Sequence, residues 1–119
     1  MAKTPASCKA KGRRFQQDIA KDISEIIGLA YGPDNDVASR GMGQNGTDIQ
    51  LSPTARKAFP YSVECKCTER LDFWGSIKQA RANCLEETDW LLVVRRNREK
   101  PVVVLDWERF LEIQKNLSN

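Results

Sequence analysis

A chain of 119 residues, 40% hydrophobic and 29% charged, is long enough to bury one core and form a single domain. It has no histidine, which excludes Ser-His-Asp and Cys-His catalysis, histidine general bases, and histidine-ligated zinc or iron. Hydrolytic chemistry in this chain must therefore use carboxylates, lysine and a hard cation. The formal net charge of +3 is too small to indicate a nucleic-acid partner by itself.

Basic residues are nevertheless grouped in two segments. Residues 1–14 contain no acidic residue, and the second group, at 95–100, is interrupted only by Glu99. Such groups are typical of proteins that bind the phosphate backbone, although a disordered basic tail and a solvated hairpin would give the same pattern. The basic residues concerned are Lys3, Lys9, Lys11, Arg13, Arg14, Arg95, Arg96, Arg98 and Lys100.

The sequence gives no sign of export or of a membrane span. It has no long apolar run, and the basic N-terminus is not followed by the apolar stretch of a secretory signal. We therefore expect the protein in the compartment where it is made, a bacterial-type cytoplasm.

The four cysteines are too few for a disulfide scaffold. Cys65 and Cys67 form a C-x-C, not the C-x-x-C of zinc ribbons. We interpret Cys65, Cys67 and Cys84 as small buried hydrophobes. A zinc-bound interaction domain that uses Cys65 and Cys67 is the alternative.

The first half of the chain is predicted to contain an arm, a helix and three strands. Residues 1–10 are expected to form a flexible basic arm, and residues 11–119 a single domain. A helix is expected over 11–29, because apolar residues recur there at helical spacing and glycines follow. This stripe consists of Phe15, Ile19, Ile23, Ile26 and Ile27. The strands are expected at 37–40, 47–51 and 61–67, with a short helix at 53–58 after Ser52-Pro53.

The second half is predicted to form a helix, a hairpin and a last helix. Asp72 is expected to cap a helix that runs to about residue 86. Apolar runs at 90–94 and 101–105 indicate two strands joined by a charged turn. Asp106 is expected to cap a final helix. Inward-packing residues are predicted to be Trp74, Trp90, Trp107, Phe110, Leu111 and Leu117. The fold class is therefore α/β, a mixed sheet flanked by helices in the order α-β-β-β-α-β-β-α.

Three charged residues on the predicted strands carry the chemistry. Glu64 and Lys66 lie two apart on one strand, so their side chains project from the same face. Asp48 lies on the preceding strand and approaches Glu64 if the two strands pair. Converging carboxylates repel unless a cation lies between them, and Mg²⁺ prefers oxygen ligands. A lysine beside such a cation stabilises charge on a phosphate, so the group indicates metal-assisted phosphodiester hydrolysis. An exposed cross-strand ion pair is the alternative for Glu64 and Lys66.

Two short motifs resemble the PD-(D/E)xK nuclease superfamily. They are Gly46-Thr47-Asp48-Ile49 and Val63-Glu64-Cys65-Lys66. Three further segments look like parts of archaeal-type Holliday junction resolvases: Lys11-Gly12, Phe15-Gln16 and Lys78-Gln79-Ala80. The stretch from residue 39 to residue 101 also looks like related phage-encoded nucleases. The motifs are degenerate, but their place in the order of elements is that of the superfamily.

The resemblance implies a metal-binding active site. Asp48 and Glu64, with the backbone carbonyl of Cys65, would hold Mg²⁺ or Mn²⁺, and Lys66 would be the catalytic lysine. Gln79 would face the water or the scissile phosphate; an exposed helical glutamine is its alternative. Gln16 stands where the resolvases carry a metal-binding glutamate, and a neutral ligand there favours one metal over two.

The resemblance also implies partners and an activity. The two basic groups, together with Arg40 in the glycine-rich loop before Asp48, supply the expected DNA-binding residues; a solvated loop arginine is the alternative for Arg40. These residues are Lys11, Arg13, Arg14, Arg40, Arg95, Arg96 and Arg98. The expected activity is that of a Mg²⁺-dependent DNA endonuclease in recombination or phage DNA metabolism, in a bacterial or phage-infected cell. It would act on structured or specific DNA, possible substrates including Holliday junctions, as a homodimer without organic cofactor or membrane partner. A catalytically silent DNA-binding module with the same fold is the alternative.

Overall fold

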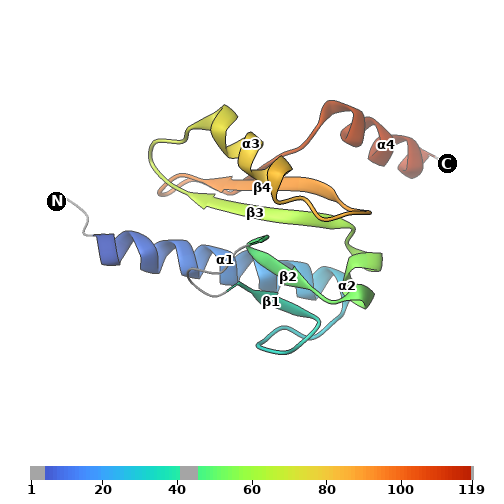
Figure 1. The fold of residues 1–119 in the computed structure, drawn as a ribbon, viewed down its shortest axis with the longest axis horizontal. Coiled ribbons are helices and arrows are strands. Elements are labelled where there is room, and N and C mark those ends of the chain that lie inside the picture. Colours follow the sequence, from blue (N-terminus) through green and yellow to red (C-terminus); the bar gives the residue numbers. More distant parts are fainter. Residues whose placement is uncertain (1–4, 41–45, 119) are drawn as a thin grey trace.

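The computed structural model of the chain describes residues 5–40 and 46–118 (Figure 1). Lys3 of the predicted arm and the centre of the glycine-rich loop before Thr47 lie outside these residues. The elements are α1 (Pro5–Ile27), β1 (Val37–Ser39), β2 (Ile49–Leu51), α2 (Pro53–Ala58), β3 (Tyr61–Cys67), α3 (Phe73–Ala82), β4 (Asp89–Arg95), β5 (Val102–Val104) and α4 (Trp107–Ser118). The predicted mixed α/β class is confirmed, with two small sheets flanked by helices.

Local signals in the sequence account for the helix ends. Helix α1 stops at a glycine, Gly28, whose φ of 71° is accessible without the cost a side chain would add. The side chain of Ser52 accepts a hydrogen bond from the N–H of Ala55 at 3.1 Å and caps α2. Asp72 caps α3 in the same way through the N–H of Gly75, also at 3.1 Å.

The strands form two sheets that meet beside β3. Strands β3 and β4 are parallel, and β4 and β5 are antiparallel. Strands β1 and β2 form a separate antiparallel hairpin. The N–H of Asp48 donates to the carbonyl oxygen of Val63 at 3.0 Å and so links this hairpin to β3. Strand β3 therefore has β4 on one edge and the hairpin on the other.

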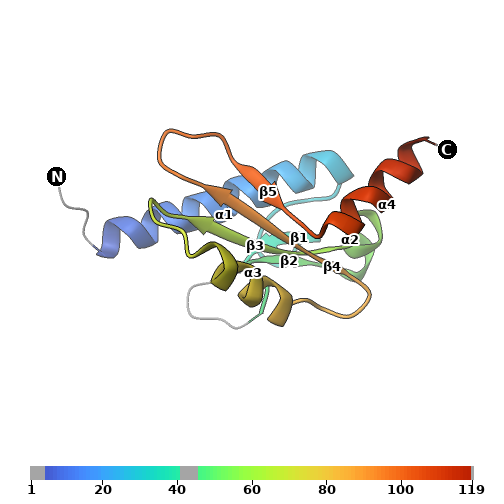
Figure 2. The same ribbon diagram turned by 90° about the horizontal axis from the view of Figure 1, so that it is seen from above.

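Helices cover both faces of β3 and β4 (Figures 1 and 2). On the α1 side, Phe15, Ile19 and Ile23 pack in one buried cluster with Val63 and Cys65. On the α3 side, Ile77, Ala80, Trp90 and Leu92 form a second cluster. This division confirms the predicted alternation of side chains along β3.

Two helix boundaries and several burial predictions differ from expectation. Helix α1 begins at Pro5, inside the predicted arm, and α3 ends at Ala82, earlier than the predicted residue 86. Trp90 is buried as predicted, but Trp74 is 72% exposed and Ile26 81% exposed. Cys65 is buried, whereas the other two cysteines predicted to be buried are only half-buried. None of the helices in the described ranges is long and apolar enough to cross a membrane.

The prediction that α4 packs its apolar residues inward is wrong. No residue of α4 is buried, and Trp107 and Leu117 are 68% and 77% exposed. The half-buried residues of α4 are Arg109 and Ile113; Arg109 donates to the hydroxyl of Tyr61 at 3.0 Å and lies 3.2 Å from Asp89. Helix α4 follows β5 and lies at one end of the molecule (Figure 2), and its large apolar side chains Trp107 and Leu117 are exposed.

Candidate active site

Asp48 is held against the edge of β3 by its backbone and its side chain. Its N–H donates to Val63, and its Oδ2 accepts a hydrogen bond from the N–H of Cys65 at 2.8 Å. The residue is 4% exposed. Because the N–H and C=O of one strand residue point to the same edge, the carbonyl of Cys65 also leaves β3 on the side of Asp48.

Glu64 lies on the face of β3 that α3 covers. It is 1% exposed, and its Oε1 accepts a hydrogen bond from Nδ2 of Asn83 at 3.0 Å. Asn83 is the residue that ends α3. An ionisable side chain is therefore buried on β3, with the amide of Asn83 as a hydrogen-bond donor.

The environment of Glu64 favours its protonated form. Burial and the nearby carboxylate of Asp48 raise the pKa of Glu64 from 4.5 to about 7. A side-chain hydrogen bond with Asp48 contributes to this rise, whereas Asn83 and the positive charge of Lys66 oppose it. The structure therefore brings Asp48, Glu64 and Lys66 into one electrostatic cluster.

Lys66 lies at the rim of this cluster. It is half-buried and follows Glu64 by two residues on the same strand, so it lies on the same face. Its positive charge lowers the pKa of Glu64, and its partial exposure leaves it accessible to a substrate.

The donor set suits a hard cation better than zinc. Two carboxylates and the Cys65 carbonyl are oxygen donors of the kind that Mg²⁺ accepts together with water. Within the described residues no three histidine, cysteine or acidic side chains lie close enough to hold a metal ion by themselves. Burial, Asp48 and Glu64 also raise the pKa of the Cys65 thiol, which disfavours the thiolate in the metal-free protein.

Arg40 also belongs to this cluster. Its guanidinium Nη2 lies 2.7 Å from Oδ1 of Asp48. In this arrangement the arginine predicted to bind DNA neutralises one of the two predicted metal ligands.

Two predicted glutamines are not among the residues that contact the carboxylates. Gln79 is exposed on α3, and within the described residues its side chain has no hydrogen bond to Asp48 or Glu64. Gln16 is half-buried on α1, the helix that covers the face of β3 opposite Glu64. Asn83, which sequence reasoning missed, takes the place beside Glu64. It lies one helical turn beyond Gln79, and this i+4 spacing is the signal that could have found it.

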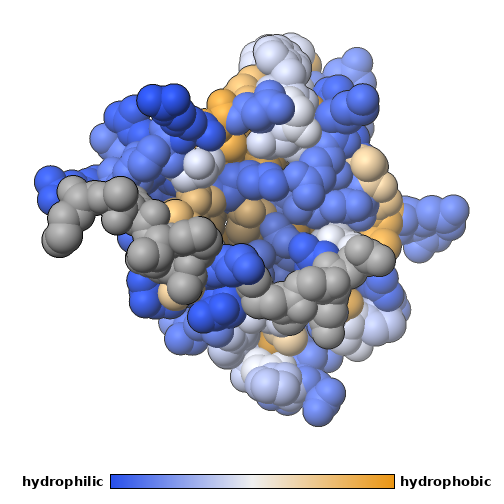
Figure 3. All heavy atoms as spheres, turned by 60° about the vertical axis from the view of Figure 1, so that its left-hand side comes forward, coloured by the Kyte–Doolittle hydropathy of each residue, from blue (hydrophilic) through white to orange (hydrophobic). Residues whose placement is uncertain are grey.

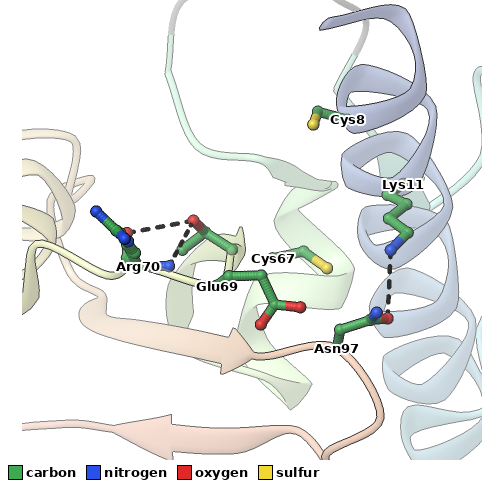
Figure 4. Close-up of a pocket in the computed structure, with 7 residues that line it drawn as sticks. Cys8, Lys11, Cys67, Glu69, Arg70 and Asn97 are labelled. Carbon is green, nitrogen blue, oxygen red and sulfur yellow. Dashed lines mark hydrogen bonds between the residues drawn. The ribbon is translucent and has the colours of Figure 1, made fainter. Parts of the chain in front are cut away.

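The two basic segments meet in space. Lys11 of α1 donates to Oδ1 of Asn97, in the turn between β4 and β5, at 3.2 Å (Figure 4). Hydrophilic side chains dominate the face of the molecule seen from this end (Figure 3). Exposed on these two elements are Lys9, Arg13, Arg14, Arg96, Arg98 and Lys100. Arg95 differs, because it is half-buried and its guanidinium lies over the ring of Phe15, 5.6 Å from the centroid.

A pocket of about 340 Å³ opens between these elements (Figure 4). It lies where the parallel strands β3 and β4 end, the edge at which α/β sheets bind ligands. Cys67 and Thr68, which directly follow Lys66, form part of its wall. The lining residues are Cys8, Lys11, Cys67, Thr68, Glu69, Arg70 and Asn97.

No family model, curated protein or solved structure matches the chain.

Proposed function

We propose that this protein is a metal-dependent DNA endonuclease that hydrolyses phosphodiester bonds at Asp48, Glu64 and Lys66. The observation that carries the proposal is the buried carboxylate pair. Two carboxylates that face each other out of water destabilise the folded chain, as the raised pKa of Glu64 indicates. A divalent cation between them would remove that repulsion, so the arrangement makes physical sense as a cation site.

Each residue then has a distinct role. Asp48, Glu64 and the Cys65 carbonyl would hold Mg²⁺, with Mn²⁺ as a substitute. When bound, the cation supplies Lewis-acid polarisation of the phosphodiester and a more acidic water. Lys66 stabilises the negative charge that develops on the phosphate. Asn83 keeps the carboxylate of Glu64 in its orientation through the 3.0 Å hydrogen bond.

The basic surface supports a long polyanion as the substrate. Exposed cations from α1 and from the β4–β5 turn lie at the end of the molecule where β3 delivers Lys66. A phosphate backbone on this surface would pass the rim of the carboxylate cluster. The motifs of the sequence favour DNA, including branched DNA such as a Holliday junction.

The second candidate function is a catalytically silent DNA-binding module. The basic surface alone supports it, because gripping a backbone needs no carboxylates. A silent module does not account for the buried glutamate, since a folded chain with an apolar residue at position 64 would be more stable. This consideration favours the nuclease.

Cleavage assays separate the two functions. Purified protein would be incubated with a four-way junction, linear duplex, supercoiled plasmid and single strand, in Mg²⁺ or in a chelator. We expect Mg²⁺-dependent cleavage that is lost in Glu64→Gln and reduced at least ~10²-fold in Lys66→Ala. Lys57→Ala, which removes an exposed lysine of α2, is the matched control and should cleave normally. Binding without cleavage by the wild-type protein on every substrate would establish the silent module.

We also propose that two copies associate through α4 and the edge strand β5. Outward-facing apolar side chains gather on these elements and on the end of α1. They are Ile26, Val102, Val103, Trp107, Phe110, Leu111 and Leu117, all at least 45% exposed. At roughly 100 Å² each they offer on the order of 700 Å², close to the ~800 Å² per partner of a standard interface. An unpaired strand edge can also join its own copy about a two-fold axis.

A further inference from the structure

Arg40 contacts Asp48 through its backbone and its side chain. Its N–H donates to the carbonyl oxygen of Asp48 at 2.7 Å, and its guanidinium lies 2.7 Å from Oδ1. The arginine side chain is 19% exposed and the aspartate side chain 6%. The ion pair is therefore largely shielded from water, where opposite charges attract more strongly than at the surface.

The two oxygens of Asp48 have partners of different kinds. Oδ2 accepts the neutral N–H of Cys65, which can remain in place when a cation binds, because each carboxylate oxygen has two lone pairs. Oδ1 faces the guanidinium of Arg40, whose full positive charge would repel a divalent cation. Arg40 and a cation therefore compete for the same carboxylate.

Not every N–H group of the Arg40 guanidinium has a hydrogen-bond partner among the described residues. Its Nε is buried and has no hydrogen-bond partner among the described residues, an arrangement that costs free energy. Arginine presents five N–H donors in a planar fork, and phosphate oxygens fill this fork in pairs. A phosphodiester near Asp48 would offer Arg40 a better partner than the single contact with Oδ1.

We propose that Arg40 exchanges partners and thereby couples DNA binding to cation binding. This inference rests on the proposed function. In the DNA-free protein Arg40 neutralises Asp48. When DNA binds, a phosphodiester group takes the guanidinium, and Asp48 becomes free to hold the cation. Because DNA and cation favour the same arrangement, each must raise the affinity for the other by the same factor.

Calorimetric titration with Ca²⁺, a divalent cation that also takes oxygen ligands, tests the exchange without relying on cleavage. Wild-type protein and Arg40→Gln would be titrated alone and with saturating duplex DNA. Without DNA, we expect Arg40→Gln to bind Ca²⁺ about tenfold more tightly than the wild type. DNA should tighten Ca²⁺ binding by roughly 5- to 150-fold in the wild type and far less in the variant.

Two further variants control for charge and for folding. Arg81→Gln removes the same charge and breaks an ion pair of 2.9 Å with Asp106, away from Asp48, and should titrate like the wild type. Arg40→Lys keeps the positive charge but lacks the fork, so its DNA-free affinity should stay near the wild type while the coupling falls. It provides the test if Arg40→Gln does not fold, as judged by circular dichroism.

The outcomes separate this inference from the proposed function. The exchange is overturned if wild type and Arg40→Gln bind Ca²⁺ equally well without DNA and if DNA tightens Ca²⁺ binding equally in both. The proposed cation site would not be affected by this result. Equal coupling in Arg40→Lys and the wild type would also overturn the exchange. If no variant binds Ca²⁺ with or without DNA, the proposed nuclease site itself is wrong.

Discussion

Replacing Glu64 by glutamine should remove a pH-dependent loss of stability from the metal-free protein. The folded chain raises the pKa of Glu64 from 4.5 to about 7, chiefly by burial and then by the carboxylate of Asp48. A raised pKa means that the folded state prefers the protonated acid. The contribution of Glu64 to stability is thus complete below pH 4.5 and is lost as the pH rises through 7. Glutamine keeps the shape and an oxygen for Asn83 but does not titrate.

The size of the effect follows from the same values. At about 1.4 kcal/mol per pH unit, the full rise in the pKa corresponds to about 3 kcal/mol. Residual water around the carboxyl group screens part of this, so we expect the observed difference to be on the order of 2 kcal/mol. Between pH 5 and pH 8 the free energy of unfolding of the wild type should fall by that amount relative to Glu64→Gln.

Urea unfolding in a chelator at the two pH values measures this difference. Glu25→Gln, which alters an exposed carboxylate of α1, is the matched control and should follow the wild type at both. Adding Mg²⁺ at pH 8 should raise the stability of the wild type more than that of Glu64→Gln, because the ligand binds the folded state with both carboxylates. A difference between wild type and Glu64→Gln that does not change with pH would refute the assignment of a strained carboxylate pair.

Three further predictions address the rest of the site and surface. Asn83→Ala removes a hydrogen bond that lowers the pKa of the buried glutamate, so the acidic limb of the cleavage rate should move to higher pH; an unshifted pH profile would show that this amide does not act on the glutamate. Neutralising Arg96 and Arg98 together should reduce the slope of log affinity against log salt on duplex DNA by about two, measured by fluorescence anisotropy. An unchanged slope would mean that DNA lies elsewhere. Exchanging Trp107 and Leu117 for serine should convert a dimer to a monomer in sedimentation equilibrium without unfolding the chain, since both side chains are exposed in the single copy. A monomeric wild type, or a variant that still dimerises, would contradict this interface.

Elements with short-range signals were predictable from the sequence. Strand β3 and helix α2 have the predicted bounds, because alternation and the Ser52-Pro53 start are local signals. Asp48 also approaches Glu64, as the pairing of their strands predicts. The start of α1 has no such local signal, and the helix begins at Pro5, several residues before the predicted residue 11.

Features that depend on tertiary contacts were not predictable. Hydrophobic periodicity in α4 shows that one face is apolar but does not say whether this chain covers it. The outward position of this apolar face follows from the contacts of Arg109 with Tyr61 and Asp89, which are distant from it in sequence. In the same way, the ion pair of Arg40 with Asp48 does not follow from spacing along the chain, since it joins residues beside different strands.

The hydrogen bond from the Cys65 N–H to Asp48 has an evolutionary consequence. In a continuous sheet, the N–H of Cys65 would donate to a backbone carbonyl of the neighbouring strand. Here the side chain of Asp48 accepts this hydrogen bond instead. Selection for folding alone would therefore retain aspartate or asparagine at position 48, with or without the nuclease activity proposed above. Position 64 is under no such pressure, because its buried acid lowers stability. Among homologues of this chain, the residue at position 64 should therefore distinguish active from inactive members, and the residue at position 48 should not.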